Sequence, residues 1–309
     1  MQDYIINING LYKSFKGVDV LKGINLKIRK GSVFCLLGSN GAGKTTTVKI
    51  LSTLLQADKG KINICGFDLK KDPQKVRESI SMTGQYAAVD ELLTGRENMY
   101  LIGQLLHIAG YKERAEILFK QFELSGAANR RSGTYSGGMR RKLDIAMSLM
   151  GNPQILFLDE PTTGLDPQNR IAMWQEVIKL KQMGITIFLT TQYLEEAERL
   201  ADHVAILNNG IITAEGSVGQ LKNLLPIGAV QLMFDEKQYG PAQSILEAES
   251  AASNDAGLSL TVMTDGSVEA LTTLLVKFRD AGIRVKSVVQ KQPTLEDVFL
   301  SQIYSGKED

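Results

Sequence analysis

One short stretch of the chain combines the residue types that hold polyphosphate. Residues 38 to 46 fit the pattern G-x-x-x-x-G-K-[ST]. Glycines allow consecutive backbone N–H groups to point into one concavity, and a helix that starts there adds the positive end of its dipole. Lys44 is expected to reach the β- and γ-phosphates, Thr45 to place its hydroxyl on Mg²⁺, and Thr46 to donate to the α-phosphate. The residues assigned to this loop are Gly38, Ser39, Asn40, Gly41, Ala42, Gly43, Lys44, Thr45 and Thr46.

The segments on either side of the loop have the order that such a motif requires. Val33 to Leu37 is an apolar run that predicts a buried strand, and Thr47 to Leu55 has helical spacing. A Gly-rich turn that matched by accident would lack this context, and average residue usage produces the pattern in roughly one chain of this length in a hundred. We therefore predict a strand, a phosphate-binding loop and a helix.

Two adjacent carboxylates follow a second apolar strand. Ile155 to Leu158 is apolar throughout, and Asp159 and Glu160 come directly after it. Such a strand belongs in a buried parallel sheet, which binds ligands at the carboxyl ends of its strands. Asp159 is therefore expected to hold Mg²⁺ through water, and Glu160 to face the γ-phosphate and accept a proton from attacking water. The alternative is a strand that leaves the sheet at a solvated carboxylate pair.

An aromatic ring and a carboxamide also lie where ligand-facing groups collect. Phe15 is in the polar turn from Lys13 to Gly17. It either stacks on a purine or packs as an ordinary hairpin aromatic, and taken alone it fits the second interpretation slightly better. Gln85 comes just beyond a strand predicted for Ile80 to Thr83, at the edge of the sheet where ligands bind.

A Ser-Gly-Gly sequence precedes a helical run from Arg141 to Met150. Ser136 suits a helix N-cap. Gly137 and Gly138 expose backbone N–H groups at the positive end of that helix. Taken by themselves, these residues fit a second anion site and a capped helix without a ligand equally well.

Composition limits the class of protein. The 309 residues are 43% hydrophobic and 22% charged with a formal net charge of +1, which fits one large or two smaller domains and gives no reason to expect nucleic acid as the main partner. No apolar run approaches the roughly 18 residues that span a bilayer, and the first residues lack the order of a signal peptide. We therefore expect a cytoplasmic protein that reaches the membrane only through a partner. Cys35 and Cys65 lie in or beside apolar runs without metal-ligand spacing, which favours buried small residues.

The order of the predicted elements indicates an α/β domain with a helical insertion, followed by a small α+β domain. We place the first domain at residues 1 to 224, with helical spacing dominating from about 86 to 150, and the second at 225 to 309. Asn209-Gly210 predicts a hairpin turn of the primed type. The polar stretch from Glu249 to Gly257 is expected to be a mobile loop.

Taken together and in order, these motifs resemble the ATP-binding-cassette (ABC) ATPases over roughly residues 3 to 222, which implies a P-loop NTPase fold. Longer matches resemble the daunorubicin-resistance type of drug exporter. The segments that carry this resemblance are LTGRENM at Leu93 to Met99, YSGGMRRKLDIAMSL at Tyr135 to Leu149, LDEPTTGLDP at Leu158 to Pro167, TTQYLEEAERLAD at Thr190 to Asp202, and PTLEDVFL at Pro293 to Leu300.

The resemblance implies a dimer in which each ATP lies between the phosphate loop of one subunit and Ser136 to Met139 of the other. It also implies that Phe15 stacks on adenine, that Gln85 senses Mg²⁺ and water and couples to the membrane partner, and that Asp166 contacts the dimer interface. The nucleotide contacts expected across the interface are Ser136, Gly137, Gly138, Met139 and Asp166. The expected partner is a separate ABC-2-type transmembrane permease, and the ATPase would lie on the cytoplasmic face of the cell membrane.

Gln192 departs from the commoner family pattern, which has a histidine that contacts the γ-phosphate. The same Thr-Thr-Gln-Tyr form is familiar in the daunorubicin-resistance group. A Gln amide donates and accepts hydrogen bonds but takes up no proton, so Glu160 would act as the base without imidazole help and turnover would be slow. Met139 and Arg140 also replace a commoner Gln-containing signature.

Three functional hypotheses follow. The first is a motor ATPase, either a homodimer or a dimer with a paralogous ATPase, that drives export of a drug or lipid-like compound. The second is an ATP-binding switch that hardly hydrolyses ATP and leaves the chemistry to a stronger paralogue. The third is a cassette ATPase outside transport that acts on nucleic acid or ribosomes, against which the near-neutral charge and the single cassette argue.

Overall fold

The computed structural model describes residues 4–84, 88–225, 229–246, 252–254, 258–264, 266–291 and 293–304. The chain folds into two compact units, Met1–Val218 and Gly219–Asp309. The division falls a few residues before the boundary expected at 224/225.

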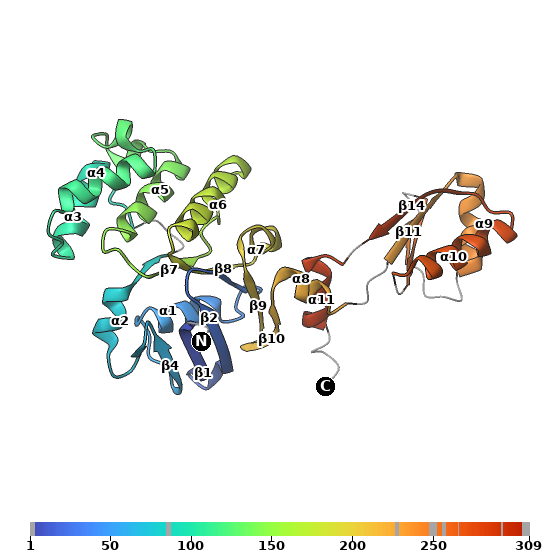
Figure 1. Ribbon diagram of the computed structural model, residues 1–309, viewed down its shortest axis with the longest axis horizontal. Coiled ribbons are helices and arrows are strands. Elements are labelled where there is room, and N and C mark those ends of the chain that lie inside the picture. The colour runs from blue at the N-terminus through green and yellow to red at the C-terminus, as the bar shows by residue number, and fades with distance from the viewer. Residues whose placement is uncertain are drawn as a thin grey trace. The chain divides into compact units, whose positions relative to one another are not determined.

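A six-stranded sheet forms the centre of the first unit (Figure 1). Its order is β10-β9-β3-β8-β7-β6, and every neighbouring pair is parallel except β9 and β10. The strands are β3 (Val33–Leu37), β6 (Ile80–Thr83), β7 (Ile155–Asp159), β8 (Thr186–Thr191), β9 (His203–Asn208) and β10 (Ile211–Gly216). The turn between β9 and β10 has φ of 47° at Asn209 and 83° at Gly210, which confirms the primed hairpin expected there.

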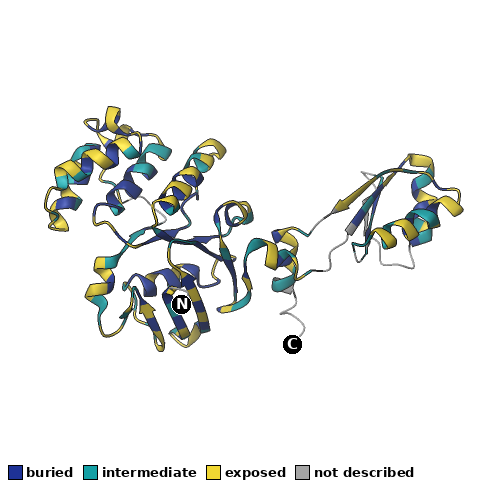
Figure 2. Ribbon diagram, viewed as in Figure 1, coloured by how far each residue is buried: buried dark blue, intermediate teal, exposed yellow. Residues whose placement is uncertain are grey.

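A row of aromatic rings crosses the middle of this sheet. Phe34 on β3 pairs in register with Phe188 on β8, which pairs with Phe157 on β7. Their ring centroids are 5.3 and 5.4 Å apart, and all three side chains are buried. Figure 2 shows the ribbon of the central sheet largely in the colour of buried residues. Because side chains alternate between the two faces of a strand, Asp159 and Thr190 share this face two residues further on. The aromatic row therefore lies on the same face of the sheet as the polar groups at the carboxyl ends of the strands, two residues before them.

An antiparallel sheet, in the order β2-β1-β4-β5, packs with α1 against the aromatic face. Its strands are β1 (Tyr4–Phe15), β2 (Val18–Arg29), β4 (Lys59–Ile64) and β5 (Phe67–Asp68). The polar turn expected from Lys13 to Gly17 is present but shorter than predicted, because β1 continues to Phe15 and β2 begins at Val18, so that only Lys16 and Gly17 form the turn. Both turn residues have positive φ, at 48° and 85°, which permits this tight reversal.

Helices cover the rest of the first unit. The phosphate-loop helix begins at Lys44, a few residues earlier than its spacing indicated. The stretch expected to be helical, about 86 to 150, holds α3, α4 and α5, with a break near His107 and Gly110, where φ is positive. The helices are α1 (Lys44–Leu51), α2 (Pro73–Ser79), α3 (Gly95–Leu105), α4 (Tyr111–Gln121), α5 (Gly137–Ser148), α6 (Pro167–Gln182) and α7 (Leu194–Leu200), with 3₁₀ turns at Ser125–Ala127 and Ser132–Thr134. A further helix, α8 (Val218–Lys222), begins at the last residue of this unit.

The second unit contains a four-stranded antiparallel sheet in the order β12-β13-β11-β14. From β11 to β14, with α9 and α10 between strands, the chain order is βαββαβ, the split βαβ arrangement of ferredoxin-like folds. Alternate residues of β11 and β13 point to a core that also contains side chains of α9 and α10, so both helices cover the same face. The elements are β11 (Ala229–Phe234), α9 (Glu236–Leu246), β12 (Ala252–Asn254), β13 (Ser259–Met263), α10 (Val268–Asp280), β14 (Val285–Lys291) and α11 (Leu295–Tyr304).

The second unit corrects one expectation and adds one helix. The polar stretch 249 to 257, expected to be a loop, contains the short strand β12, which pairs with β13. Helix α9 was not expected. Across the described residues of both units, every helix is too short or too polar to traverse a bilayer.

Removing the central ring of the aromatic row tests its importance for stability. Phe188→Ala is expected to lower the unfolding free energy of the first unit by about 3–5 kcal/mol, because a large buried side chain leaves a cavity between two neighbouring rings. Urea denaturation followed by circular dichroism measures this change. Leu54→Ala, at a side chain that is 68% exposed, is the control, and equal effects of the two substitutions would contradict the assignment.

Candidate active site

The phosphate loop depends on close backbone packing. A Cβ atom at Gly38 would lie 2.5 Å from the carbonyl oxygen of Leu207 on β9, so a side chain has no room there. Gly41 and Gly43 have φ of 82° and 113°, which other residues adopt only with strain. Main-chain geometry alone therefore explains these three glycines.

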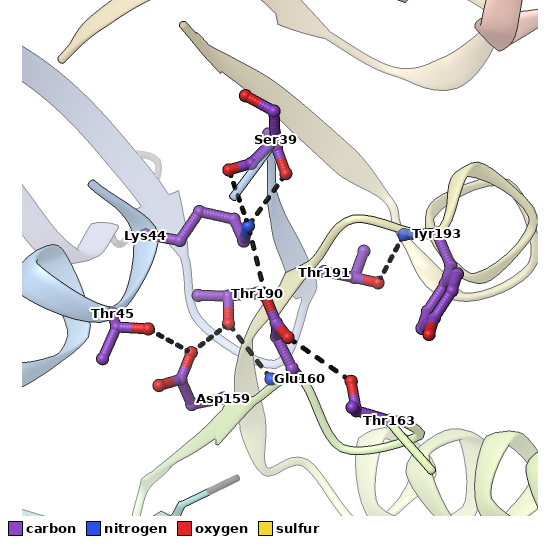
Figure 3. Close-up of polar contacts among 10 residues, drawn as sticks. Ser39, Lys44, Thr45, Asp159, Glu160, Thr163, Thr190, Thr191 and Tyr193 are labelled. Carbon is purple, nitrogen blue, oxygen red and sulfur yellow. Dashed lines mark hydrogen bonds and ion pairs between the residues drawn. The ribbon is translucent and has the colours of Figure 1, made fainter. Parts of the chain in front are cut away.

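The ammonium group of Lys44 has three partners, two in the loop and one after β7 (Figure 3). Its ammonium group donates to the carbonyl oxygens of Gly38 at 2.8 Å and Ser39 at 3.0 Å. The third partner is Glu160, whose Oε1 lies 3.2 Å from Nζ. The Lys44 side chain is 4% exposed and that of Glu160 is 12% exposed, so this pair is largely removed from water.

The carboxylate of Asp159 links the loop helix to the neighbouring strand. Thr45 Oγ1 donates to Asp159 Oδ1 at 3.4 Å, and Thr190 Oγ1 donates to the same oxygen at 2.5 Å (Figure 3). Hydroxyl and carboxylate oxygens are ligands that Mg²⁺ accepts. Thr45 and Asp159 therefore fit the donor set of a magnesium site beside a phosphate loop.

Glu160 is held in an unusual backbone conformation. Its φ is 48°, in the left-handed region that costs a non-glycine residue roughly 1–2 kcal/mol. The N–H of Glu160 donates to both the carbonyl and the hydroxyl oxygen of Thr190, at 3.0 and 3.2 Å. Thr163 Oγ1 donates to Glu160 Oε2 at 3.4 Å. The turn after β7 thereby directs the carboxylate back toward Lys44 rather than away into solvent.

These residues surround one hollow in the first unit. Of the residues expected from the sequence, Asp159 and Glu160 come together with most of the phosphate loop. The hollow is lined by Val20, Asn40, Gly41, Gly43, Lys44, Thr45, Thr46, Asp159 and Glu160. Gly38 and Ser39 contribute carbonyl groups to Lys44, and Ala42 is buried beside them.

Other expected residues do not line this hollow. Phe15 is 43% exposed at the end of the long hairpin, with Lys13 Nζ 5.3 Å from its ring centroid. Gln192 follows directly after β8 and is half-buried. Gln85 lies outside the described residues. The structure therefore does not test the nucleotide contacts assigned to these three side chains.

The Ser-Gly-Gly sequence and Asp166 each begin a helix. Ser136 caps α5, because its hydroxyl accepts the N–H of Met139 at 3.2 Å, as the sequence predicted. Asp166 caps α6 and accepts the N–H of Asn169 at 2.9 Å, a bond that lowers the pKa of Asp166. Ser136 and Gly137 are exposed and lie away from the hollow.

Sequence reasoning missed two residues of the site. Val20 on β2 reaches the hollow from the antiparallel sheet, and Thr190 bonds to both carboxylate residues. Their place in the site becomes clear only when the neighbouring strands are known. The one available signal for Thr190 was a polar side chain at the end of an apolar strand that neighbours β7 in the sheet.

This arrangement defines a P-loop nucleoside triphosphatase. A lysine-containing loop between β3 and α1 faces two carboxylates at the end of β7, across the carboxyl edge of a parallel sheet. Comparison with known proteins defines the class further. The family model described as ABC transporter matches residues 21–163.

Several relatives match almost the whole chain, among them the following two. A daunorubicin resistance ATP-binding protein of Streptomyces coeruleorubidus is 41% identical over 307 residues, which cover 97% of this chain and 95% of the relative. A linearmycin resistance ATP-binding protein of Bacillus subtilis is 31% identical over 304 residues, covering 96% and 97%.

A solved structure agrees with these matches. An ATP-binding cassette in a dimeric, post-hydrolysis state bound to ADP and phosphate superposes with a TM-score of 0.61 at 26% identity, covering 69% of this chain and 98% of that one. The chain belongs to the ATP-binding proteins of ABC transporters. It is an ATPase that binds ATP and whose hydrolysis of ATP drives transport.

A buried carboxyl group on α7 lies close to the loops of the site. Glu196 on α7 is fully buried, and its Oε1 accepts the indole N–H of Trp174 at 3.2 Å. Burial raises the pKa of Glu196, and the nearby Thr191 and Thr162 side chains and the Trp174 indole only partly offset this effect. Thr162 lies two residues after Glu160, and Thr191 directly follows Thr190. The carboxyl therefore packs beneath both loops that leave the active-site strands.

The raised pKa of Glu196 predicts how stability changes with pH. The folded state holds the proton more tightly than the unfolded state, so Glu196 lowers stability progressively as pH rises above about 4.3, the ordinary glutamate value. Glu196→Gln removes this loss, and its stability relative to the wild type should increase with pH. Urea denaturation from pH 5 to pH 8 measures the difference. Glu195→Gln, on the exposed side of the same helix, is the control, and a pH-independent difference for Glu196→Gln would exclude this explanation.

Proposed function

We propose that the chain is the ATP-hydrolysing subunit of an exporter for a drug or lipid-like compound, acting on a separate transmembrane permease. The single observation that carries the catalytic part is the meeting of Lys44, Asp159 and Glu160 in one hollow. Full-length similarity to two antibiotic-resistance ATP-binding proteins supports the export part. On this proposal the chain lies on the cytoplasmic face of the cell membrane.

Different groups of the chain bind the phosphates, hold the metal ion and accept the proton. The loop N–H groups and Lys44 bind the phosphate chain and offset its charge. Thr45 and Asp159 would hold Mg²⁺, directly or through water, and the ion supplies further neutralisation of charge on the phosphates. Glu160 accepts the proton of the attacking water, and its contact with Lys44 holds the carboxylate at the hollow. Phe15 would stack on the adenine, and Gln85 would respond to the metal site.

The proposed active form is a dimer. Ser136 to Met139 and Asp166 begin their helices away from the hollow of their own chain, so they would serve the ATP of a second chain. The dimeric state of the related cassette supports this arrangement. The second chain is either another copy or a paralogous ATPase. Each loop would thus carry half of a composite site.

Gln192 favours the second candidate function, an ATP-binding switch with weak hydrolysis. It follows β8 two residues after Thr190, where an imidazole would offer an ionisable group close to neutral pH. A carboxamide offers only hydrogen bonds. Glu160 would then be the sole base, and a low turnover number in the isolated dimer would favour the switch.

Removing the proposed base separates binding from chemistry. Glu160→Gln is expected to keep ATP binding within a few-fold of the wild type and to lower phosphate release by about 10²–10⁴-fold, the usual contribution of a general base. Fluorescent-nucleotide titration and a phosphate assay measure the two quantities. Glu78→Gln, at an exposed position of α2, is the matched control. Unchanged phosphate release by Glu160→Gln would remove the assigned role.

Reconstitution with the membrane partner tests the transport part. We expect ATP hydrolysis by the chain, purified with its permease in vesicles, to rise several-fold when a transported drug or lipid-like compound is added. The same series without permease should show no stimulation. Stimulation by DNA or RNA instead, lost as salt is raised, would support the hypothesis of an ATPase outside transport.

A further inference from the structure

Thr190 makes contacts that no other described side chain of the site makes. Its hydroxyl donates to Asp159 Oδ1 at 2.5 Å and accepts the N–H of Glu160 at 3.2 Å (Figure 3). Its carbonyl oxygen accepts the same N–H at 3.0 Å. One fully buried residue on β8 is thus bonded to both carboxylate residues that end β7.

Strand pairing makes these contacts rigid. Asp159 and Thr190 are directly paired in the parallel register of β7 and β8, so their side chains lie side by side on one face of the sheet. The next residue on β8, Thr191, has a carbonyl oxygen that accepts the N–H of Gly38 at 3.2 Å, which ties the same strand end to the phosphate loop. The strand end therefore contacts the groups proposed for phosphate, metal and base.

The hydroxyl restricts both carboxylate residues in different ways. Asp159 Oδ1 accepts both Thr190 and the weaker bond from Thr45 at 3.4 Å, which fixes the rotation of the carboxylate. At Glu160, the two bonds from its N–H to Thr190 hold the left-handed turn, with φ of 48°, that directs the side chain toward Lys44. A valine at position 190 would fill nearly the same volume and provide neither hydroxyl contact.

We infer that Thr190 is a positioning residue. Its hydroxyl holds two groups in place at the same time: the metal-binding carboxylate of Asp159 and the main chain of the proposed base, Glu160. It touches neither substrate nor metal on this view, and acts through its two neighbours. The inference rests on the proposed function. It adds that the metal position and the base position are coupled through β8, the strand that leads to Gln192.

A set of threonine variants tests this role. Thr190→Val should lower kcat for Mg²⁺-dependent ATP hydrolysis by about ten-fold or more, the effect expected from losing a hydrogen bond to a charged group, with a smaller change in KM for ATP. Thr190→Ser keeps the hydroxyl and should remain within about three-fold of the wild type. Thr186→Val is the matched control, because Thr186 is equally buried at the other end of β8 and its hydroxyl accepts the N–H of Gly31 at 2.9 Å.

A second measurement avoids turnover. In a Glu160→Gln background, fluorescent-nucleotide binding is titrated with Mg²⁺, and Thr190→Val should raise the Mg²⁺ concentration at half-saturation by about ten-fold while Thr186→Val leaves it unchanged. Equal effects of Thr190→Val and Thr186→Val in both assays would overturn the inference, as would a Thr190→Ser variant as impaired as Thr190→Val. If Thr190→Val does not fold, Thr190→Ala takes its place in the Mg²⁺ titration. Thr190→Ala should then raise the Mg²⁺ concentration at half-saturation and Thr190→Ser should not, and equal values for these two variants would overturn the inference. A wild-type chain that neither binds nor hydrolyses Mg²⁺-ATP would instead refute the proposed function itself.

Discussion

The structure depends on keeping one ammonium group and two carboxylates together with little access to water. Lys44 and Asp159 are each 4% exposed and Glu160 is not much more accessible. A buried charge is tolerated only when hydrogen bonds and opposite charges replace its hydration. Lys44 meets this condition with two carbonyl oxygens and Glu160, and Asp159 meets it with two threonine hydroxyls. The fold around them can be understood as the means of holding these partners in place.

The parallel sheet provides that support because its strands end together. β3, β8 and β7 are neighbours in register, so the phosphate loop, Thr190 and Asp159 leave the sheet at one edge. The row of Phe34, Phe188 and Phe157 lies just below, and its close packing resists small shifts of one strand against the next. A displacement of β8 would therefore disturb both carboxylate residues at once, whereas motion of the helices on the surface need not.

Much of this arrangement could be predicted from local sequence. The strand, loop and helix around Lys44, the buried strand before Asp159 and the cap at Ser136 all follow from spacing and residue type, and the structure confirms these elements. Val20 and Thr190 could not be predicted, because their roles depend on which strands become neighbours. Helix α9 was missed because Gly240 and Pro241 resemble a turn, yet packing of its apolar face against the second sheet outweighs that local preference.

The left-handed backbone at Glu160 limits how this position can change in evolution. A new residue at position 160 must first tolerate the left-handed backbone, whatever the chemistry of its side chain. Glycine, asparagine and aspartate accept a φ of 48° with little strain, whereas valine, isoleucine and threonine do not. Lineages that lose hydrolysis at this position should therefore drift first to small or amide-bearing residues, retaining a chain that still folds and still holds nucleotide.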